Sequence, residues 1–378
     1  MKLIHLSDLH LGKRINEFSM LEDQEFILNR ILKIAGEEKP DGVIVAGDVY
    51  DRSVPAEEAM GLWDDFLISL SEMHVPVYAI SGNHDSARRF ADHGRLVSSS
   101  GIYLAPEYDG TVTSVEARDE YGIIRIWLLP FVKPAQVRRF FPDEEINDYT
   151  DACRVAISQM DIDTSCRNVL VAHQFVTGAV RCESEEIVVG GLDNVDASVF
   201  DDFDYVALGH IHGSQSIGRD TVRYCGTPLK YSLSEKDHVK SVTVVELAGK
   251  SSVSIRPVPL APRHDLREIR GTYEELTARK NYEETATDDY IYAVLTDEND
   301  VTDAMAKLRI IYPNLMKIRY DNARTREQRD LAEGGNAERL SPMEIFEEFY
   351  EKQNNQPMTE EQRELVSDLI VSVWEEGR

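Results

Sequence analysis

The segment Val43-Ile-Val-Ala-Gly-Asp-Val-Tyr-Asp-Arg52 is an apolar run that ends abruptly in a glycine and a carboxylate. The run from Val43 to Ala46 predicts a buried strand, and Gly47 allows the backbone to turn tightly as it leaves the sheet. Asp48 should then lie at the carboxyl end of that strand, where open α/β sheets bind their ligands. A glycine–aspartate pair after a strand is weak evidence alone, because many such pairs only form turns.

Strands and helices alternate on both sides of this segment. Strands are predicted at 2–6, 43–46 and 77–80, with helices at 20–35 and 55–73 between them. This alternation is typical of a layered α/β domain. A helix is predicted at 147–160, and seven further strands predict a second sheet packed on the first. These strands lie at 111–115, 121–129, 168–172, 204–208, 222–225, 241–247 and 253–257. A charged turn is predicted over 116–120.

The chain of 378 residues, 42% of them hydrophobic, is long enough for two or three domains. We expect an α/β domain over residues 1–262 and a small α+β unit over 263–322, separated at a proline-containing stretch. Within the small unit, helices are predicted over 273–279 and 303–310. Residues 323–340 are charged and contain two adjacent glycines, so they predict a linker. Residues 341–378 predict two amphipathic helices, each opened by a capping box.

Composition narrows the classes of function. No apolar run reaches the roughly 18 residues of a membrane span, and the N-terminus reaches Asp8 too soon for a signal peptide. The four cysteines are widely spaced, which is typical of reduced thiols in a cytoplasmic protein. The formal net charge is −27, so binding of nucleic acid would need local positive charge, metal ions or a partner.

Five segments share one property: each is an apolar strand that ends in oxygen or imidazole side chains. They are Asp8-Leu-His10, Gly47-Asp48, Gly82-Asn-His-Asp85, Ala172-His173 and Gly209-His-Ile-His212. A single histidine at a strand end is more often structural, but five of the ten histidines fall in these segments. Mixed carboxylate, amide and imidazole ligands suit manganese, iron or zinc better than calcium or magnesium. We therefore expect two metal ions that promote in-line attack at phosphorus, with Asp48 as the bridging carboxylate.

With this motif series the chain resembles the calcineurin-like metallophosphoesterases, and more narrowly the SbcD family, the nuclease subunits of bacterial SbcCD complexes. The closer likeness covers roughly residues 1 to 260 and is carried by Ile4-His-Leu-Ser-Asp-Leu-His-Leu-Gly12, Gly47-Asp-Val-Tyr-Asp-Arg-Ser53, Phe203-Asp-Tyr-Val-Ala-Leu-Gly-His-Ile-His212 and Arg223-Tyr-Cys-Gly-Thr-Pro-Leu-Lys-Tyr-Ser232. It implies an α/β fold: a two-sheet metallophosphoesterase sandwich flanked by helices, with a small α+β capping domain and a C-terminal helical pair.

The resemblance also implies the ligand sets of two divalent metal ions, for which Mn²⁺ is the expected ion. One ion would be held by Asp8, His10, Asp48 and His212, and the other by Asp48, Asn83, His173 and His210. His84 would face the scissile phosphate and assist the leaving oxygen, as an imidazole can near neutral pH. The alternative is that His84 only orients Asp48, and Asp85 is expected to support a ligand rather than to bind metal.

Positive charge close to these motifs indicates where a nucleic-acid backbone would lie. Lys13, Arg52 and Arg88 each follow a metal motif directly, so they are candidates for substrate binding. Solvated surface charge is the alternative for each of them, and a salt bridge is a further alternative for Arg52.

The resemblance implies that DNA is the substrate, cut by 3′-to-5′ double-strand exonuclease and single-strand or hairpin endonuclease action in repair and recombination. Residues 341–378 carry ten acidic and three basic residues and would bind the coiled coil of an SbcC-like ATPase, with the chain a homodimer within a heterotetramer. Packing of these helices on the chain's own core is the alternative. Two other functions stay open: a stand-alone metallophosphatase or cyclic-nucleotide phosphodiesterase of the same fold, and a non-catalytic scaffold.

Overall fold

The computed structural model of the protein describes residues 1–90, 98–185 and 194–323, together with positions 325, 326, 343, 346, 347, 350, 358, 359, 362, 363, 365 and 366. Its chain divides into two compact units, one of Met1–Ile269, Thr277–Ala293 and Met305–Ile318, and the other of Arg270–Leu276, Val294–Ala304 and Arg319–Arg378. The predicted linker and C-terminal helices lie almost wholly outside the described residues. Within those residues, no helix is both long enough and apolar enough to cross a membrane.

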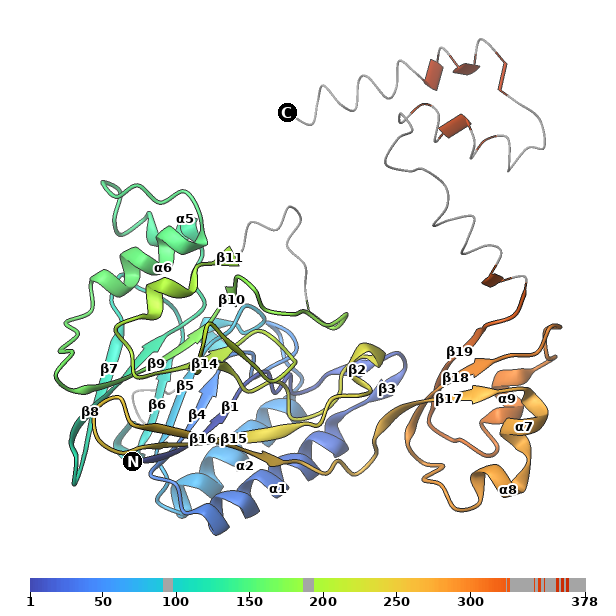
Figure 1. Cartoon of the computed structure of the whole chain (residues 1–378), viewed down its shortest axis with the longest axis horizontal. Coiled ribbons are helices and arrows are strands. Elements are labelled where there is room, and N and C mark those ends of the chain that lie inside the picture. The colour runs from blue at the N-terminus through green and yellow to red at the C-terminus, as the bar shows by residue number, and fades with distance from the viewer. Residues whose placement is uncertain are drawn as a thin grey trace. The chain divides into compact units, whose positions relative to one another are not determined.

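The first sheet has six strands in the order β16-β15-β1-β4-β5-β6 (Figure 1). Its central strands β1, β4, β5 and β6 are parallel, and β15 and β16 add antiparallel pairs at one edge. The bounds of the six strands are β1 Lys2–Leu6, β4 Gly42–Ala46, β5 Val77–Ile80, β6 Ile102–Ala105, β15 Ser241–Leu247 and β16 Val253–Pro259.

The second sheet also has six strands, in the order β13-β14-β12-β9-β8-β7. Strands β8, β9, β12 and β14 are parallel, and the two edge strands β7 and β13 pair antiparallel. The bounds are β7 Thr113–Asp119, β8 Gly122–Leu129, β9 Arg167–His173, β12 Tyr205–Gly209, β13 Gln215–Ile217 and β14 Arg219–Tyr224. The prediction of an α/β fold with two packed sheets is confirmed. The strands predicted at 241–247 and 253–257 were wrongly placed in the second sheet, because β15 pairs with β1 and so extends the first sheet together with β16.

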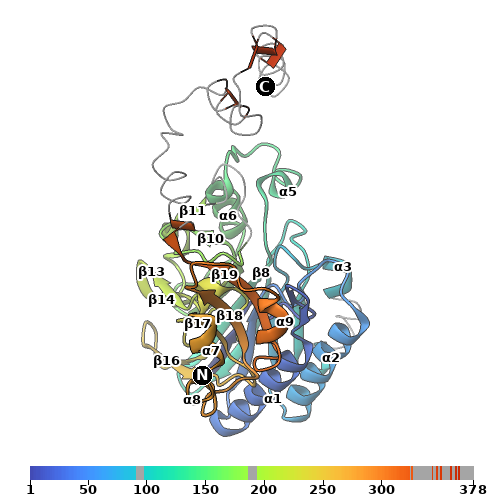
Figure 2. The same ribbon diagram turned by 90° about the vertical axis from the view of Figure 1, so that its right-hand side faces the viewer.

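Helices cover the outer faces of the two sheets. Helices α1 (Leu21–Glu38) and α2 (Glu57–Glu72) run side by side along the first sheet, as Figures 1 and 2 show. Helix α6 (Tyr149–Ser158) shares a hydrophobic cluster with strands β9 and β12 of the second sheet. The chain thus forms a helix–sheet–sheet–helix sandwich.

The burial of strand β4 on both of its faces explains why its sequence is apolar throughout. Val43 and Val45 belong to the cluster that contains the inner faces of α1 and α2. Ile44 and Ala46 belong to the cluster that fills the space between the two sheets. Because alternate side chains of a strand point to opposite faces, a strand buried on both faces has no polar positions.

A three-stranded sheet follows in the order β17-β18-β19, with strands Leu266–Gly271, Tyr290–Leu295 and Leu315–Tyr320. The helix predicted over 273–279 is two short helices, α7 (Tyr273–Thr277) and α8 (Arg279–Tyr282), because Ala278 between them is extended. Helix α9 (Ala304–Leu308) lies within the helix predicted over 303–310.

Two other local predictions were wrong. Residues 116–119 are not a turn but part of β7, where Glu116 pairs across the ladder with Arg125 and Asp119 with Gly122. Opposite charges on paired positions stabilise adjacent strands. Helix α1 does not stop at Gly36 but continues to Glu38, and Lys39 ends it in a left-handed conformation. Strands β6 and β13 were not predicted. The remaining short elements were not predicted either, namely β2 (Arg14–Ile15), β3 (Phe18–Ser19), α3 (Ala87–Phe90), α5 (Pro134–Val137), β10 (Phe175–Val176), β11 (Asn194–Val195) and the 3-10 turns at 98–100, 197–200 and 233–235.

Candidate metal centre

Five parallel strands bring the five predicted segments to one place. Each of these strands ends within three residues of a predicted ligand. They are β1, β4 and β5 of the first sheet and β9 and β12 of the second. Neighbouring parallel strands present their carboxyl ends at the same edge of a sheet, and the two sheets pack face to face. The predicted ligands therefore converge from both sheets.

Asp48 lies at the centre of this group. Its Oδ2 atom is 3.3 Å from His173 Nε2, 3.8 Å from His10 Nε2 and 3.9 Å from His84 Nε2. Asp48 belongs to two groups whose ligand atoms lie within 4.8 Å of one another, one with His10 and His84 and the other with Asp8 and His173. One carboxylate is thus shared between two sets of ligands, which is what a bridging ligand requires.

The other predicted ligands extend these two sets. His10 Nε2 lies 3.2 Å from His212 Nε2, and Asp8 forms a third group with these two residues. Asn83 Oδ1 lies 3.0 Å from His173 Nε2 and 3.0 Å from His210 Nδ1. The structure therefore brings all seven predicted metal ligands into one cluster.

The chemistry of this cluster fits divalent cations. Asp8 and Asp48 are buried, and a buried carboxylate is costly unless positive charge lies beside it. Carboxylate, amide oxygen and imidazole are the ligands of first-row divalent metals in proteins. The cluster is therefore a site for divalent metal ions.

The electrostatic environment of Asp48 also indicates a site for divalent metal ions. Burial raises the pKa of the Asp8 carboxyl. Burial also acts on Asp48, but the imidazoles beside it, His173 foremost, outweigh burial and hold the pKa of that carboxyl well below its usual range. Burial alone would lower the pKa of His173, yet the Asp48 and Asp8 carboxylates raise it to about 9. The two carboxylates thus favour a positive charge at this point, which divalent cations supply.

Hydrogen bonds fix which imidazole nitrogens face the cluster. His173 Nδ1 donates to the carbonyl oxygen of Ala46 at 2.8 Å, which leaves Nε2 facing Asp48. His212 Nδ1 lies 2.7 Å from Ser184 Oγ, which leaves Nε2 facing His10. Partners of this kind set the tautomer and the ring orientation of a metal-binding histidine.

Three buried charged side chains hold His212 in place. Glu185 Oε1 accepts the backbone N–H of His212 at 2.7 Å, and Lys240 Nζ donates to its carbonyl oxygen at 3.0 Å. Glu235 Oε1 accepts from Ser184 Oγ at 2.7 Å, and its other oxygen pairs with Lys240 Nζ at 2.5 Å. Burial acts against the ionised form of Glu235, but the nearby His212 and Lys240 hold its pKa well below the ordinary value. These three residues were not predicted from the sequence, since none of them ends a predicted strand.

The backbone of the cluster adopts an uncommon conformation. Asp8, His10, Asp48 and His210 have φ angles of +53°, +46°, +51° and +99°. Side chains other than glycine rarely occupy this left-handed region, and residues held there cost about 1–3 kcal/mol each. Such strain persists only where the surrounding structure enforces it, and here it coincides with four of the predicted ligands.

Glycines allow the two sheets to approach each other at the cluster. A Cβ atom on Gly209 would lie 1.8 Å from the carbonyl oxygen of Ala46 and 2.7 Å from His173 Nδ1. A Cβ atom on Gly82 would lie 2.1 Å from Asp48 Oδ1. Gly47 has a φ of +85°, and a Cβ there would lie 2.4 Å from His173 Nδ1. The site therefore requires glycine at these three positions, because any larger residue would clash with its neighbours.

Gly209→Ala is expected to lower the free energy of unfolding by about 3 kcal/mol or more, because backbone of β4 blocks the new methyl group. Gly61→Ala is a matched control on α2, where a Cβ would meet nothing within 4 Å. Alanine is a better helix former, so this control should raise stability by about 1 kcal/mol. Urea unfolding of both variants measures the difference, and a Gly209→Ala protein as stable as the parent would contradict the close approach.

His84 lies beside Asp48 with its side chain 19% exposed. Its backbone N–H donates to Asp48 Oδ1 at 2.9 Å, and its Nδ1 lies 3.0 Å from the carbonyl oxygen of Asp51. A bond that orients Asp48 therefore comes from the backbone of His84, and the imidazole Nε2 remains directed toward the cluster.

Asp85 supports the loops that carry the ligands. Its carboxylate accepts the backbone N–H groups of Val49, Tyr50 and Gly82 at 3.1, 2.9 and 2.9 Å. Burial, together with the nearby Asp48, raises the pKa of Asp85 to about 6. The residue thus ties the loop after β4 to the loop after β5.

The predicted substrate-binding cations differ in their surroundings. Lys13 Nζ pairs with Asp51 Oδ1 at 2.7 Å, and the Lys13 side chain is only 15% exposed. The Arg52 side chain is 76% exposed, and its Nε lies 3.7 Å from Asp51 Oδ2. Asp51 therefore supplies a counter-charge to both. The Arg88 side chain lies outside the described residues.

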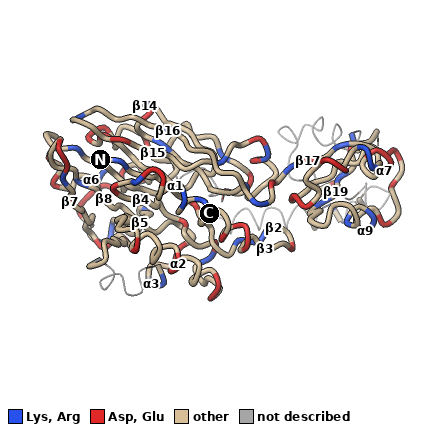
Figure 3. The backbone as a smooth tube through the Cα atoms, turned by 90° about the horizontal axis from the view of Figure 1, so that it is seen from below, with Lys and Arg blue, Asp and Glu red and all other residues tan. Residues whose placement is uncertain are grey.

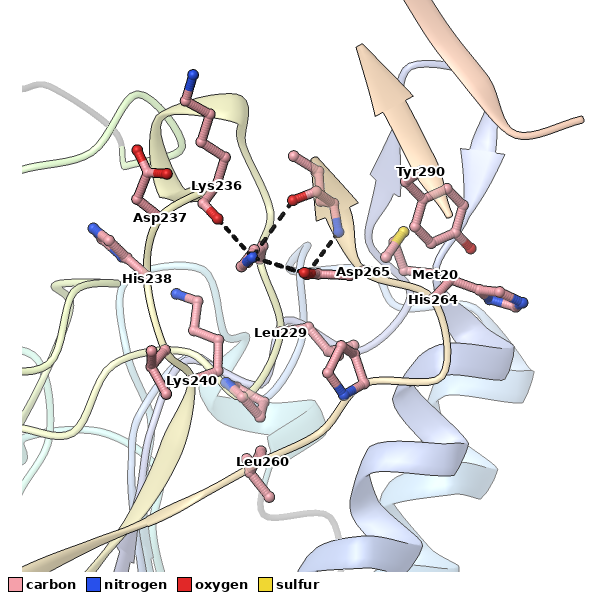
Figure 4. A pocket seen from close by; sticks show the side chains of 15 residues that line it. Met20, Leu229, Lys236, Asp237, His238, Lys240, Leu260, His264, Asp265 and Tyr290 are labelled. Atoms are coloured by element: carbon pink, nitrogen blue, oxygen red, sulfur yellow. Dashed lines mark hydrogen bonds and ion pairs between the residues drawn. The ribbon is translucent and has the colours of Figure 1, made fainter. Parts of the chain in front are cut away.

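A cavity of about 310 Å³ lies apart from the metal cluster (Figure 4). Lys236, Asp237 and His238 are on one side of it, and His264 and Tyr290 are on the other. None of the predicted metal ligands lines it. Lys240 both lines the cavity and contacts the carbonyl oxygen of His212, but the lysines of this cavity are already paired with carboxylates. The metal cluster is therefore the better candidate for the reaction centre.

Two family models match the chain. Residues 1–214 match the calcineurin-like phosphoesterases, and residues 262–354 match the SbcD_C model, described as the type 5 capsule protein repressor C-terminal domain.

Relatives match over the whole length. The chain is 30% identical over 377 residues to the SbcD subunit of the nuclease SbcCD from Staphylococcus epidermidis, covering 98% of each protein. It is 31% identical over 386 residues to the protein of the same name from Staphylococcus saprophyticus, covering 100% of each. A dimetal phosphatase from Danio rerio is 12% identical to the chain with a TM-score of 0.42, and the match covers 69% of this chain and 96% of that one.

Proposed function

The chain belongs to the SbcD family of calcineurin-like phosphoesterases, and on this basis we propose that it is the DNA nuclease subunit of an SbcCD-type complex. It is a metal-dependent phosphodiesterase. We propose 3′-to-5′ exonuclease action on double strands and endonuclease action on single strands and hairpins, in repair and recombination. The observation that carries the proposal is the convergence of five strand ends, from two sheets, on the shared carboxylate Asp48.

Two metal ions are proposed, with Mn²⁺ in both positions. Asp8, His10, Asp48 and His212 would hold one, and Asp48, Asn83, His173 and His210 would hold the other. The support for this division is the sharing of Asp48 between two ligand groups, together with the 3.2 Å approach of His10 to His212 and the 3.0 Å approaches of Asn83 to His173 and His210. When bound, such ions neutralise phosphate charge and activate water.

The proposed role of His84 is to protonate the leaving oxygen. Its Nδ1–H donates to the carbonyl oxygen of Asp51, which would fix the ring and leave Nε2 as the nitrogen that carries the transferable proton. The exposure of the side chain supports contact with a substrate, since six of the seven predicted ligands are buried, all except Asn83.

The acidic chain must bind a polyanion through local positive charge. Figure 3 shows lysine and arginine interspersed with acidic residues along the described backbone. Two divalent ions at the cluster would supply about four positive charges, and an ATPase partner would supply further contacts with DNA. Residues 263–322 are proposed as the capping domain that limits which DNA reaches the site.

Residues 341–378 are proposed to bind the coiled coil of an SbcC-like ATPase, with two copies of each chain in a cytoplasmic heterotetramer. Among the described positions of this segment, Phe346 and Leu365 are large hydrophobic residues with 38% and 62% of their surface exposed. Exposed apolar positions on helices suit docking into a groove of a partner.

Replacing Phe346 and Leu365 together by glutamate is expected to abolish co-purification with the ATPase partner. DNA cleavage by the isolated chain should not change. Ile310→Glu, at a position 83% exposed in the other unit, is the matched control and should still co-purify. Retention of the partner by the double variant would contradict docking through this segment.

The test of the proposed function is cleavage of end-labelled linear and hairpin DNA by the purified chain, with Mn²⁺ and with chelator. A 4-nitrophenyl phosphate and a cyclic nucleotide are tested beside the DNA. Mn²⁺-dependent DNA degradation with slow turnover of the small esters is the expected result. Rapid turnover of small esters with intact DNA would support the stand-alone phosphatase or cyclic-nucleotide phosphodiesterase instead, and no activity on any substrate would support the scaffold.

A further inference from the structure

Phe131 is an aromatic residue at the metal cluster that does not belong to the hydrophobic core. It lies two residues beyond β8 and is partly exposed. Its ring centroid is 6.4 Å from that of His210, with the rings nearly parallel at 18°, and 6.1 Å from that of His173, edge-on. None of the three clusters found among the described residues includes it. Two proposed metal ligands are thus among its ring neighbours, with Tyr149 as a third at 6.3 Å.

A second aromatic ring, that of Phe175, lies near His210. A cationic side chain lies over the ring of each of the two phenylalanines. Phe175 of β10 is 6.5 Å from His210, with the rings inclined at 66°. The guanidinium carbon of Arg181 lies 3.6 Å from the centroid of Phe175, and Lys133 Nζ lies 5.8 Å from the centroid of Phe131. Lys133 is exposed, and Arg181 is partly exposed.

The backbone around Phe131 is held by bonds to the loops of the cluster. The N–H of Phe131 donates to the carbonyl oxygen of Ser81 at 3.1 Å, next to the Gly82-Asn83 motif. Gln174, which follows the proposed ligand His173, donates through Nε2 to the carbonyl oxygen of Val132 at 3.2 Å. The ring is therefore positioned relative to both sheets, as a binding surface for substrate requires.

We infer that the Phe131 ring, the exposed cation Lys133 and the Arg181 guanidinium, which is stacked on the core-packed ring of Phe175, form a stacking surface for the nucleotide next to the scissile phosphate. The inference rests on the proposed nuclease function and extends it to how the strand is held. Aromatic rings interleaved with cations bind a nucleic-acid strand independently of its sequence, because every base has a face that stacks. A chain with a net charge of −27 has particular need of such contacts.

The inference predicts that Phe131 matters for DNA and not for a substrate without bases. Phe131→Leu keeps apolar bulk but removes the aromatic face. It is expected to lower kcat/KM for single-stranded DNA by about 10-fold or more, since stacking of one base contributes on the order of that factor. Cleavage of a single strand built from abasic nucleotides, which has no aromatic ring to stack, and the bound Mn²⁺ should stay at parent levels. Phe131→Trp should restore DNA cleavage.

Phe26→Leu is the matched control, since Phe26 is a 36% exposed phenylalanine on α1. Parent-level DNA cleavage by Phe131→Leu would overturn the inference. Equal losses on DNA and on the abasic strand, or loss of Mn²⁺, would overturn it as well, because Phe131 would then only support His210. A parent chain that turns over a small phosphodiester but leaves DNA intact would instead overturn the nuclease function, and the inference with it.

Discussion

Replacing His84 by alanine is expected to lower the rate of DNA cleavage by about 10²- to 10⁴-fold, the usual contribution of a general acid. Bound Mn²⁺ should not change. The physical reason is that alanine retains the backbone N–H that donates to Asp48 Oδ1 at 2.9 Å, while it loses the imidazole. Single-turnover cleavage of labelled DNA and metal analysis of the purified variant measure the two quantities.

His74→Ala is the matched control for this variant, because His74 is an exposed histidine that follows α2. It should cleave DNA at the parent rate. A His84→Ala protein that loses Mn²⁺ in proportion to its activity would show that the imidazole supports the metal cluster rather than the leaving group. A variant with full metal and full activity would remove His84 from the mechanism.

Replacing Asp48 by asparagine is expected to remove most of the bound Mn²⁺ and to reduce cleavage below detection. The amide keeps the shape of the side chain but loses the negative charge, and Asp48 is the carboxylate that two of the ligand groups share. Metal-dependent stabilisation should disappear with the metal. The parent should gain about 2.7 kcal/mol when free Mn²⁺ exceeds its dissociation constant 100-fold, whereas the variant should gain almost nothing.

Thermal unfolding with chelator and with increasing Mn²⁺ measures this effect. Asp65→Asn, which replaces an exposed carboxylate on α2, is the matched control and should behave like the parent. An Asp48→Asn protein with parent-level metal content and the same Mn²⁺-dependent rise in melting temperature would show that Asp48 is not a shared ligand.

Local sequence patterns were enough to predict two packed sheets and the five segments that gather at the candidate site, whereas the division of the ligands between two ions came from the family resemblance. Strand β4 could be predicted because a strand buried on both faces is apolar at every position and ends where Gly47 and Asp48 begin. The predicted ligands were recognisable because strand ends are local features, and a carboxylate or imidazole directly after an apolar run is visible without knowledge of the fold. Their gathering follows from the common direction of parallel strands.

How the ligands are held depends on contacts between distant parts of the chain. Glu185 approaches His212 from the segment after β10, and Glu235 and Lys240 approach it from the segment between β14 and β15. No local pattern marks a residue whose partner is distant in the chain. The left-handed backbone at Asp8 and Asp48 is likewise enforced by neighbours, since these residues would not adopt it in isolation.

The short elements and the steric roles of the glycines also depended on tertiary contacts. A strand of two residues such as β2 has too little periodicity to be predicted, and the charged part of β7 is a strand because β8 pairs with it. Gly209 is visible in the sequence, but the reason why it must be glycine is not. A side chain there would clash with the carbonyl oxygen of Ala46, which belongs to the other sheet. Local chemistry thus identified the side chains, and packing between the sheets set their geometry.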